Sequence, residues 1–502
     1  MARDTLDVGS TNRHTVTGLR VFPRYLAPAK REDILRRAAQ IAWVTTKHFG
    51  PFALRTARQG GRAAVRTMRP DAFARPLRLT FEELGTTFMK FGRLVASSPG
   101  IFGDDIAAEF RGCLDTGPAV PFDDVRHIVE SELGMPLEEA FASFEREPIG
   151  RASIAVVHKA ILQDGSEVAV KVLRPGIEHS VSIDMDLFEP LLQIVARTTG
   201  EFFAGQLLQM LDGFRMQLGE ELDLRNERRA IEHMAELLQI VDLPLVVVPQ
   251  TYAELSGARV LTMEFFDGIA VDDLARIEAY GFDPSPVVTQ TVKGFLLTTI
   301  RWGFFHGDVH AGNLLLLHDG RLGVIDWGII GRLDEDSHTF FRKSVEAGLG
   351  DEAAWDDIAA MASKIYGPLI AELGMTDDEL TQFMRMMMQP LLTQPFGQVS
   401  LVDILNAPQR LVAETRGLEA EKMTLRGVLK RWREQRKLRL LAEDEGIVDS
   451  DFERGMFLLS KALMYFERYG KMYMADQALF EDEEFFRTAL SAEEDASTSR
   501  TG

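Results

Sequence analysis

Phe305-His306-Gly307-Asp308-Val309-His310-Ala311-Gly312-Asn313-Leu314-Leu315-Leu316 is the stretch around which the rest of the chain is organised. After a short turn it continues as Leu322-Gly323-Val324-Ile325-Asp326-Trp327-Gly328. The turn, residues 317–321, holds Asp319-Gly320 between two apolar runs, which is typical of a β-hairpin. A hairpin here would return Asn313 towards Asp326. The sequence therefore predicts that the Asn313 amide and the Asp326 carboxylate lie close together at one site.

These polar residues have the chemistry that phosphoryl transfer needs. Mg²⁺ on nucleotide phosphates takes oxygen ligands, and a carboxylate beside the attacking group positions or deprotonates it. Asn313 and Asp326 are the expected metal ligands, and Asp308 the expected catalytic carboxylate, with His306 beside it. The alternative is that Asp, Gly and Asn stand here only as turn formers.

Length and composition bound what surrounds this stretch. A chain of 502 residues predicts two or three domains, and 46% apolar with 26% charged residues is an ordinary globular composition. Cys113 is the single cysteine, so an internal disulfide and a cysteine-rich zinc site are excluded and a reducing, cytoplasmic setting is expected. No run is apolar enough for a signal peptide or a spanning helix, so any membrane contact should be peripheral.

Charge is distributed unevenly along the chain. The net charge is -20, yet residues 1–80 hold sixteen Lys and Arg against five Asp and Glu, a balance of +11. The acidic remainder argues against nucleic acid, whereas the basic arm suggests docking or contact with an anionic membrane or lipid. Its apolar residues at helical spacing predict either an interfacial helix or a helix packed on the protein's own acidic surface. These residues are Ile34, Ala38, Ile41, Ala42 and Thr45.

A second helical block follows and ends before residue 148. Leu84, Phe88, Phe91 and Val95 recur at i, i+4, i+7 and i+11, which predicts one apolar stripe of a helix. Lys90 and Arg93 lie on a neighbouring face. Further helical patterns cover residues 106–110 and 122–144.

From residue 148 the periodicity changes to that of strands. Residues 154–162 and 167–173 read as two strands joined at Asp164-Gly165. Lys171 lies inside the apolar run Val-Ala-Val-Lys-Val, and a buried lysine needs its charge met, here by phosphate oxygens and a carboxylate. A lysine extending from a sheet edge is the alternative. The carboxylate would come from residues 220–227, where helical phase leaves Glu221 and Glu227 both open. Residues 245–248 and 259–266 read as the last strands of the same small sheet.

In combination, the span from about Leu84 to Leu333 resembles the UbiB/AarF (ADCK) family of atypical protein-kinase-like proteins. The family's Lys-x-Gly-Gln, alanine-rich loop, Glu-x-Asp with a pairing Glu, His-x-Asp…Asn and Asp-Phe-Gly motifs have counterparts in this order. They are Lys90-Phe91-Gly92-Arg93, Gly150-Arg151-Ala152-Ser153, Glu221-Leu222-Asp223 with Glu227, His306-Gly307-Asp308 with Asn313, and Asp326-Trp327-Gly328.

The resemblance implies a bilobal α+β kinase-like fold with a small β-rich N-lobe and a helical C-lobe, and with added N-terminal and C-terminal helices. The implied regions are a basic arm (1–80), a helical block (81–147), the N-lobe (148–268), the C-lobe (269–400), C-terminal helices (401–484) and an acidic disordered tail (485–502). It also implies MgATP as cofactor and an ATPase or kinase activity towards an unidentified acceptor, with lipids among the candidates.

Site residues carry over with the same resemblance. Lys171 and Glu227 join Asp308 and His306 as catalytic residues, and Asn313 and Asp326 hold the metal. The expected nucleotide contacts are Gly150, Arg151, Ala152, Ser153, Lys171, Met263, Glu264, Phe266, Lys90, Glu221 and Asp223. Backbone groups of Glu264 and Phe266 would meet the adenine, with Met263 behind it.

The chain departs from the family pattern at a few positions. Arg93 stands for Gln, Gly150-Arg151 for two alanines and Trp327 for Phe, and no Ala-Pro-Glu follows Gly328. The missing Ala-Pro-Glu leaves a protein substrate less supported than ATP. Two other functions stay open. One is a small-molecule kinase of the aminoglycoside- or choline-phosphotransferase type, which shares His-Gly-Asp…Asn and Ile-Asp-Trp, and the other is a nucleotide-regulated scaffold with little turnover.

Overall fold

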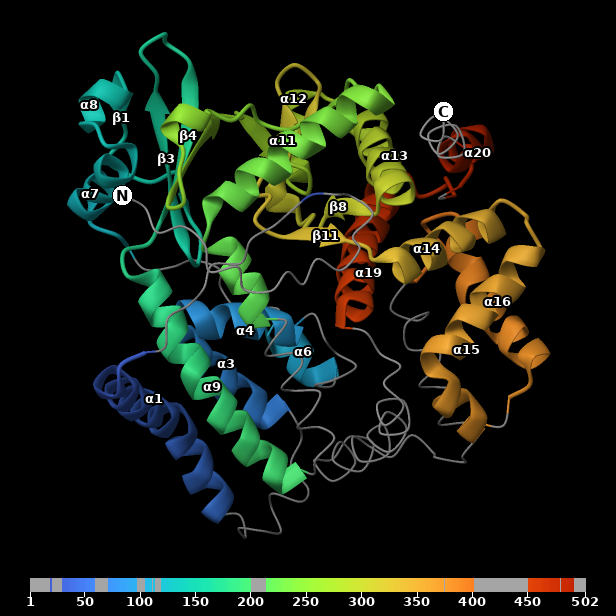
Figure 1. Cartoon of the computed structure of the whole chain (residues 1–502), viewed down its shortest axis with the longest axis horizontal. Coiled ribbons are helices and arrows are strands. Elements are labelled where there is room, and N and C mark those ends of the chain that lie inside the picture. The colour runs from blue at the N-terminus through green and yellow to red at the C-terminus, as the bar shows by residue number, and fades with distance from the viewer. Residues whose placement is uncertain are drawn as a thin grey trace, which may run out of the picture.

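The strands on either side of Lys171 form the centre of the first lobe in the computed structural model. The structure describes residues 19, 29–58, 71–96, 104–110, 112, 119–199, 214–373, 375–400, 450–478 and 480–491. A β-rich lobe and a helical lobe lie side by side, and a block of helices lies beneath them in the view of Figure 1. This confirms the predicted bilobal α+β architecture with added helices.

The first lobe is a five-stranded sheet. Its strands are β1 (Ser143–Phe144), β2 (Gly150–Arg151), β3 (Ala155–Ile161), β4 (Glu167–Leu173) and β6 (Val260–Glu264). The order is β1-β3-β4-β6, with β2 also pairing β3, and neighbouring strands in this sheet are antiparallel. On one face, valines of β3 and β4 pack on α7 (Phe122–Leu133) and α8 (Leu137–Ala140). On the other face Ala169 and Leu173 join the main core.

A four-stranded sheet lies at the junction of the lobes, in the order β5-β10-β9-β7. It is made of β5 (Val246–Val247), β7 (Gly268–Ala270), β9 (Leu314–Leu317) and β10 (Leu322–Val324). The hairpin predicted at residues 317–321 is present, because β9 and β10 pair antiparallel with Leu322 opposite Leu316. The placement of residues 245–248 in the first sheet was wrong. β5 instead runs parallel to β10, since its amide and carbonyl groups meet that strand rather than β6.

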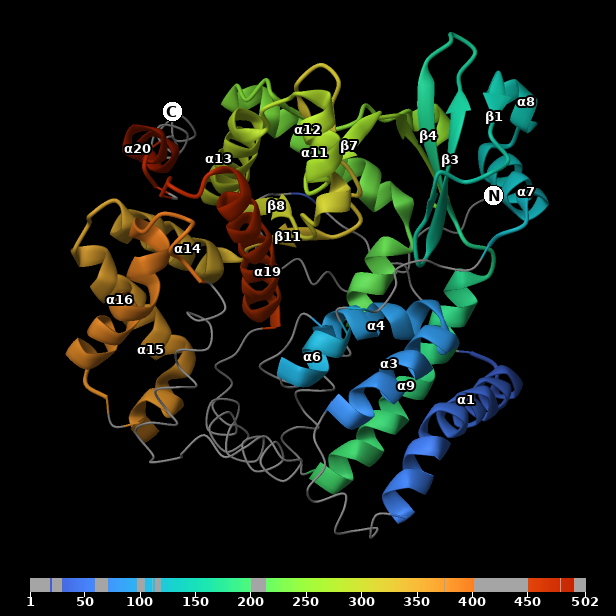
Figure 2. The same cartoon turned by 180° about the vertical axis from the view of Figure 1, so that it is seen from behind.

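The second lobe is mainly helical. Its elements are α12 (Leu274–Tyr280), α13 (Ser285–Trp302), β8 (Phe304–His306), β11 (Ile330–Arg332), α14 (Glu335–Gly348), α15 (Ala353–Leu373), α16 (Asp377–Thr393), α19 (Ser450–Tyr473) and α20 (Glu483–Ser491). β8 and β11 pair antiparallel across the predicted catalytic stretch. α19 runs alongside β11, α13 and α14, as both views show (Figures 1 and 2). α19 therefore lies close to residues 306–313.

The lower block consists of α1 (Arg31–Arg58), α3 (Asp71–Leu84), α4 (Thr86–Ala96) and α6 (Asp104–Phe110), packed on α9 (Ile177–Thr199). Leu84, Phe88, Phe91 and Val95 are all buried, as the stripe predicted. They do not belong to one helix, however. The chain turns at Gly85, whose φ of +90° lies in the left-handed region that favours glycine, so Leu84 ends α3 and the others belong to α4.

Three further sequence predictions differ from the structure or lie outside it. The helical pattern over 122–144 ends at α8, and its last residues form β1, because they pair with Ala160 and Ile161 of β3. One face of α1 packs on the protein, as Val44 is buried, while Leu35, Trp43 and Leu54 are exposed. The acidic tail predicted to be disordered over 485–502 is helical up to Ser491, because these residues belong to α20, and 492–502 fall outside the described residues. A basic helix that the sequence predicts at 429–441 also falls outside them. Within the described part of the chain, no helix is both long and apolar enough to span a bilayer.

Candidate functional site

Lys171 lies on β4 on the face that the strand turns towards the second lobe, because alternate residues point to opposite faces. Its Nζ donates to Glu227 Oε1 at 2.8 Å and Oε2 at 2.9 Å, and to Asp326 Oδ1 at 2.7 Å. Glu227 lies in the first turn of α11 (Leu224–Val241) and is buried. The sequence left Glu221 and Glu227 open as partners of Lys171, and the structure places Glu227 there.

Lys171, Glu227 and Asp326 shift one another's pKa. Burial by itself lowers the pKa of Lys171, but Asp326 and Glu227 outweigh it, so the pKa is raised and the ammonium is charged at neutral pH. The partial burial of Asp326 likewise disfavours its ionised form, and Lys171 again outweighs this effect and lowers the pKa of Asp326. Burial raises the pKa of Glu227, with Lys171 opposing. The side chain of Asp326 is 44% exposed, so this carboxylate is the member of the trio that a ligand can reach.

Asp326 adopts a backbone conformation that is unusual for its type. Its φ is +58°, in the left-handed region, and residues other than glycine occupy it where the surroundings hold them there. The peptide N–H of Ile325 donates to the carbonyl of Asn313 at 2.9 Å, which fixes the two predicted metal ligands across the hairpin. Trp327 fixes the other side, since its Nε1 donates to the Val324 carbonyl at 2.9 Å and its ring is buried.

Asn313 is buried at the end of the short 3-10 turn Ala311–Asn313. Its Nδ2 donates to the carbonyl of Asp308 at 3.0 Å, which assigns the amide nitrogen to the loop and leaves Oδ1 as the atom available to a metal. Asp326 and Asn313 together offer carboxylate and amide oxygens, the donor set that suits Mg²⁺. No cluster of three or more His, Cys, Asp or Glu that could hold a metal ion occurs among the described residues.

His306 is buried beneath the predicted catalytic loop. Its Nδ1 accepts from the peptide N–H of Asp308 at 3.0 Å, and its Nε2 lies 3.1 Å from the carbonyl of Ile325. These two contacts assign the proton to Nε2, and burial lowers the pKa so that the ring is neutral. Both nitrogens are therefore occupied by the backbone. His306 joins the two loops rather than offering a nitrogen to a substrate.

Asp308 is buried and lies between two cations, one from α19 and one from α4. Lys461 Nζ of α19 lies 2.7 Å from Oδ1, and Arg93 Nη2 of α4 lies 3.6 Å from Oδ2. Burial raises the pKa of Asp308, but Lys461 and Arg93 outweigh it and lower that pKa to about 2. Oδ1 is buried against the Lys461 ammonium.

The acidic motif at residues 221–223 divides between two partners. Glu221 forms an ion pair with Lys90 of α4 and also accepts from Gln217. Asp223 caps α11 by accepting from the Arg225 N–H at 3.1 Å, and the Arg225 guanidinium holds both of its oxygens. The prediction that Asp223 contacts the nucleotide therefore has no support in this geometry, because its carboxylate is already committed to the helix start.

The loop that should face the phosphates is held from outside. The Arg174 guanidinium donates to the carbonyl of Ala152 at 3.0–3.1 Å, and the Thr86 hydroxyl of α4 donates to the carbonyl of Ser153 at 2.9 Å. Gly150 and Arg151 form β2 at the start of this loop. Two loop carbonyls are thus turned away from the site by partners that the sequence patterns did not indicate.

The predicted adenine contacts lie at the end of β6. Met263 is buried, and the Glu264 N–H donates to the Gln250 carbonyl at 2.8 Å, so only the carbonyl of Glu264 can serve a base. Phe266 follows in the connection to β7. Its ring lies against Gly323, where a Cβ would approach within 2.5 Å, so the close contact there requires glycine.

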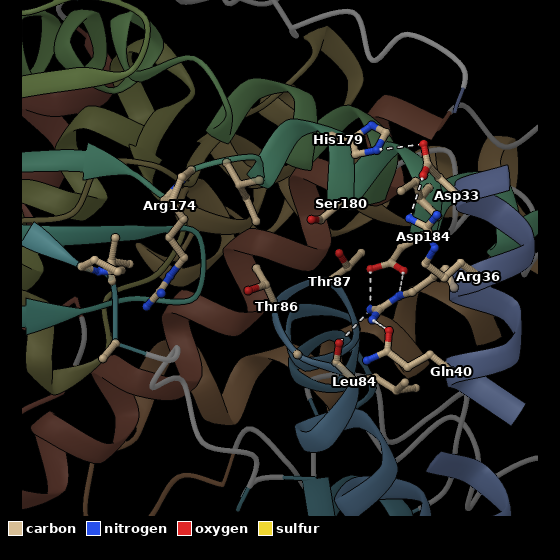
Figure 3. Close-up of a pocket in the computed structure, with 18 residues that line it drawn as sticks. Asp33, Arg36, Gln40, Leu84, Thr86, Thr87, Arg174, His179, Ser180 and Asp184 are labelled. Atoms are coloured by element: carbon tan, nitrogen blue, oxygen red, sulfur yellow. Dashed lines mark hydrogen bonds and ion pairs between the residues drawn. The ribbon is translucent and has the colours of Figure 1, made fainter. Parts of the chain in front are cut away.

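A separate pocket of about 540 Å³ lies between α1, α4 and the start of α9 (Figure 3). Its polar wall is an ion pair, in which Arg37 holds both oxygens of Asp184 at 2.7 and 3.1 Å and also donates to the Leu84 carbonyl. Lys171, Asp308 and Asp326 do not line this pocket. Arg174 and Thr86, which bind carbonyls of the loop at residues 150–153, also line this pocket.

Lys461 is the residue at this site that the sequence analysis missed. It stands in the run Phe457-Leu458-Leu459-Ser460-Lys461-Ala462-Leu463-Met464-Tyr465-Phe466, a lone charge among apolar residues. That is the signal that marked Lys171. Its position beside Asp308 could not be inferred because the contact joins residues far apart in the chain.

Comparisons with known proteins agree with the motif pattern. A model of the ABC1 atypical kinase-like domain matches residues 113–354. An uncharacterized protein of Mycobacterium tuberculosis is 33% identical over 472 residues, which is 93% of this chain and 86% of that protein. An uncharacterized aarF domain-containing protein kinase of Arabidopsis thaliana, described as chloroplastic, is 30% identical over 81% of this chain and 73% of its own. A probable protein kinase UbiB of Cellvibrio japonicus is 29% identical over 66% of this chain and 59% of its own.

Proposed function

The chain belongs to the UbiB/AarF family of atypical kinase-like proteins, and from that premise we propose that it binds MgATP and transfers the γ-phosphoryl group to a hydroxyl acceptor or water. The observation that carries the proposal is Lys171 between buried Glu227 and accessible Asp326. A charged lysine fixed beside an open carboxylate is where phosphate oxygens and their cation can bind together.

The cofactor residues follow from the donor atoms. Asp326 and Asn313 Oδ1 would hold Mg²⁺, which supplies the charge that neutralises the phosphate oxygens. Lys171 would bind phosphate oxygens and Glu227 would hold it in place. The backbone of residues 150–153 would lie over the phosphates, and the carbonyl of Glu264, with Phe266 and Met263, would surround the base.

Asp308 is the residue placed for the acceptor. An acceptor hydroxyl that donates to its carboxylate would be aligned for attack. The acceptor oxygen forms a bond to the γ-phosphorus while the bond from that phosphorus to the β–γ bridging oxygen breaks. The acceptor proton passes to Asp308 and ADP leaves. His306 acts by holding the peptide of Asp308, which makes it a positioning residue.

The helical block favours restricted access to this site. α4 contributes three contacts around the mouth, from Thr86 to the phosphate loop, from Lys90 to Glu221 and from Arg93 to Asp308. A small acceptor passes such a cover more readily than a folded protein does, and this favours small-molecule or lipid acceptors. The nucleotide-regulated scaffold stays as the second candidate, because the low pKa of Asp308 is unfavourable for a general base.

We also propose peripheral contact between α1 and an anionic membrane. Leu35, Trp43 and Leu54 are 71%, 63% and 61% exposed, and helical geometry places them within about 100° of arc. The exposed apolar side chains can enter the surface of a bilayer. The net charge of +11 on residues 1–80 attracts this segment to anionic lipids.

The test of the proposed activity is turnover by Asp308→Asn. Phosphate release and transfer of labelled γ-phosphate should fall by about a hundredfold or more, because positioned acid–base groups contribute about 10²–10⁴. MgATP should still raise the unfolding temperature of the variant. Asp319→Asn, an exposed aspartate paired with Arg321, serves as the matched control and should behave as the unaltered protein. Stabilisation by MgATP without any release or transfer, with lipid extracts present, would replace the kinase proposal by the scaffold.

A further inference from the structure

Lys461 reaches Asp308 from α19, at the far end of the sequence. Its side chain is 16% exposed, and Nζ lies 2.7 Å from Oδ1 of Asp308. A largely buried ammonium is costly unless it meets an anion, so its position beside this carboxylate needs a reason. Two reasons are available: the contact attaches the helix, or the charge serves the site.

The helix has other contacts that attach it. Arg454 pairs with Glu220 at 2.7 Å, and Arg332 pairs with the same carboxylate at 2.9 Å. The hydroxyl of Tyr469 donates to the Val309 carbonyl at 2.9 Å, and that of Tyr473 to the Val271 carbonyl at 2.6 Å. An apolar face adds to these bonds, made of Leu458, Leu459, Ala462, Phe466 and Tyr469. Lys461 is therefore not required to hold α19 in place.

The site, by contrast, lacks a cation that Lys461 can supply. Between Asp308 and Asn313 the loop reads Val309-His310-Ala311-Gly312, without lysine or arginine. His310 uses its Nδ1 to accept from the Gly312 N–H, which commits it to the loop turn. Positive charge at Asp308 comes instead from Lys461 and, at a longer distance, from Arg93.

The geometry of the contact leaves donors of Lys461 available. Nζ lies 2.7 Å from Oδ1 of Asp308, and an ammonium has three N–H donors. A single contact with this carboxylate does not use all three. The other donors can turn to further oxygens that arrive beside Asp308.

We propose that Lys461 is a catalytic residue of the phosphoryl transfer, supplied to the active site by α19, where it donates to oxygens of the phosphoryl group as that group moves towards the acceptor. The inference rests on the proposed function and adds a residue to it. Negative charge spread over the moving phosphoryl oxygens is stabilised most by donors that are already in place. Lys461 is in place before the reaction, because α19 is attached by Arg454, Tyr469 and Tyr473.

Three variants of the full chain test the role: Lys461→Met, Lys461→Arg and the control Lys471→Met. Lys471 lies ten residues further on the same helix and pairs with Glu467. We expect Lys461→Met to lower phosphate release by about a hundredfold, the loss typical of one transition-state donor. Its MgATP affinity should stay within about threefold, since the phosphates of bound ATP are held by other groups. Lys461→Arg should retain part of the rate of the unaltered protein, and Lys471→Met should retain all of it.

A binding readout makes the test independent of turnover. MgADP with aluminium fluoride imitates the phosphoryl group in transit, so its extra stabilisation over MgADP should be lost in Lys461→Met and kept in Lys471→Met. Equal stabilisation of Lys461→Met and the unaltered protein by this complex would overturn the role of Lys461. An increased rate in Lys461→Met would also overturn it, and would make Lys461 a brake on Asp308. A protein that no nucleotide stabilises would instead remove the proposed function itself.

Discussion

Lys171 and Lys461 stand in similar sequence patterns, but only for Lys171 could the partner be predicted from the sequence. Each is a single charge within an apolar run, and each lies beside a carboxylate in the structure. For Lys171 the later motifs along the chain indicated the partners. For Lys461 nothing near it in the sequence indicates Asp308, because a contact between residues 153 positions apart is set by how whole elements pack.

The roles of Glu227 and His306 depended on how their side chains are oriented in the folded protein. Glu221 and Glu227 both fitted the helical pattern, and only the folded position of α11 decides that Glu227 meets Lys171. His306 was expected to be catalytic from its motif. The hydrogen bonds of both ring nitrogens to the backbone assign it to positioning instead, and periodicity cannot show such bonds.

Trp327 gives a prediction at the residue scale. Trp327→Phe removes the Nε1 hydrogen bond to the Val324 carbonyl and leaves space in a buried site, so we expect unfolding to become easier by about 1–3 kcal/mol. MgATP affinity should not change, because phenylalanine keeps an aromatic ring beside Phe304 and His306 and Lys171 still holds Asp326. Chemical unfolding and MgATP titration measure the two effects. Trp43→Phe, at an exposed position, is the control, and a lost affinity with unchanged stability would contradict the packing role.

Helices and strands could be predicted where the apolar residues keep one periodicity along the whole element. The strands around Lys171, the hairpin at residues 317–321 and the buried stripe of α4 followed from periodicity. Boundaries did not, because single residues decide them. The turn at Gly85 splits the predicted stripe between two helices, and pairing with β3 draws residues 143–144 into a strand.

α4 gives a prediction at the element scale, because its contacts surround the mouth of the site. Lys90→Ala breaks the ion pair with Glu221 while Lys171, Asn313 and Asp326 keep their contacts. MgATP affinity should stay within about tenfold, a cost below roughly 1.4 kcal/mol. ATP turnover or self-phosphorylation should rise because the cover loosens.

The control for this prediction is Lys47→Ala on α1, which breaks the comparable pair with Glu83 away from the site. That variant should leave turnover unchanged. A loss of MgATP binding in Lys90→Ala as large as that of a metal-ligand variant would show that Lys90 binds the phosphates directly, and α4 would then be part of the binding site rather than its cover.

At the scale of the whole molecule, two added regions meet one catalytic stretch. The N-terminal block reaches it through α4, and α19 reaches it through Lys461 and Tyr469. Family motifs predicted the two lobes and the site between them. They did not predict that α19 completes the surroundings of Asp308, because motifs of the shared core contain no information about a helix beyond it.

The charge distribution gives a prediction at the same scale. The protein should float with vesicles containing an anionic lipid and be released as salt rises, because a basic segment is attracted over about a Debye length. Trp43→Ser with Leu35→Ser should weaken flotation by removing exposed apolar contact from α1. Met386→Ser, an exposed apolar residue of α16, is the control. Equal flotation of all three proteins would exclude α1 as the contact.

The central claim, that Asp326 and Lys171 form a MgATP site, is tested most directly by titrating ATP in the presence and absence of Mg²⁺ into the unaltered protein and Asp326→Asn. Loss of this carboxylate removes the main anionic ligand of the cation. We expect tight Mg²⁺-dependent binding to the unaltered protein, and at least a hundredfold weaker binding, no longer dependent on Mg²⁺, to Asp326→Asn, with the far-ultraviolet spectrum unchanged. Equal Mg²⁺-dependent affinity in the two proteins would contradict the account.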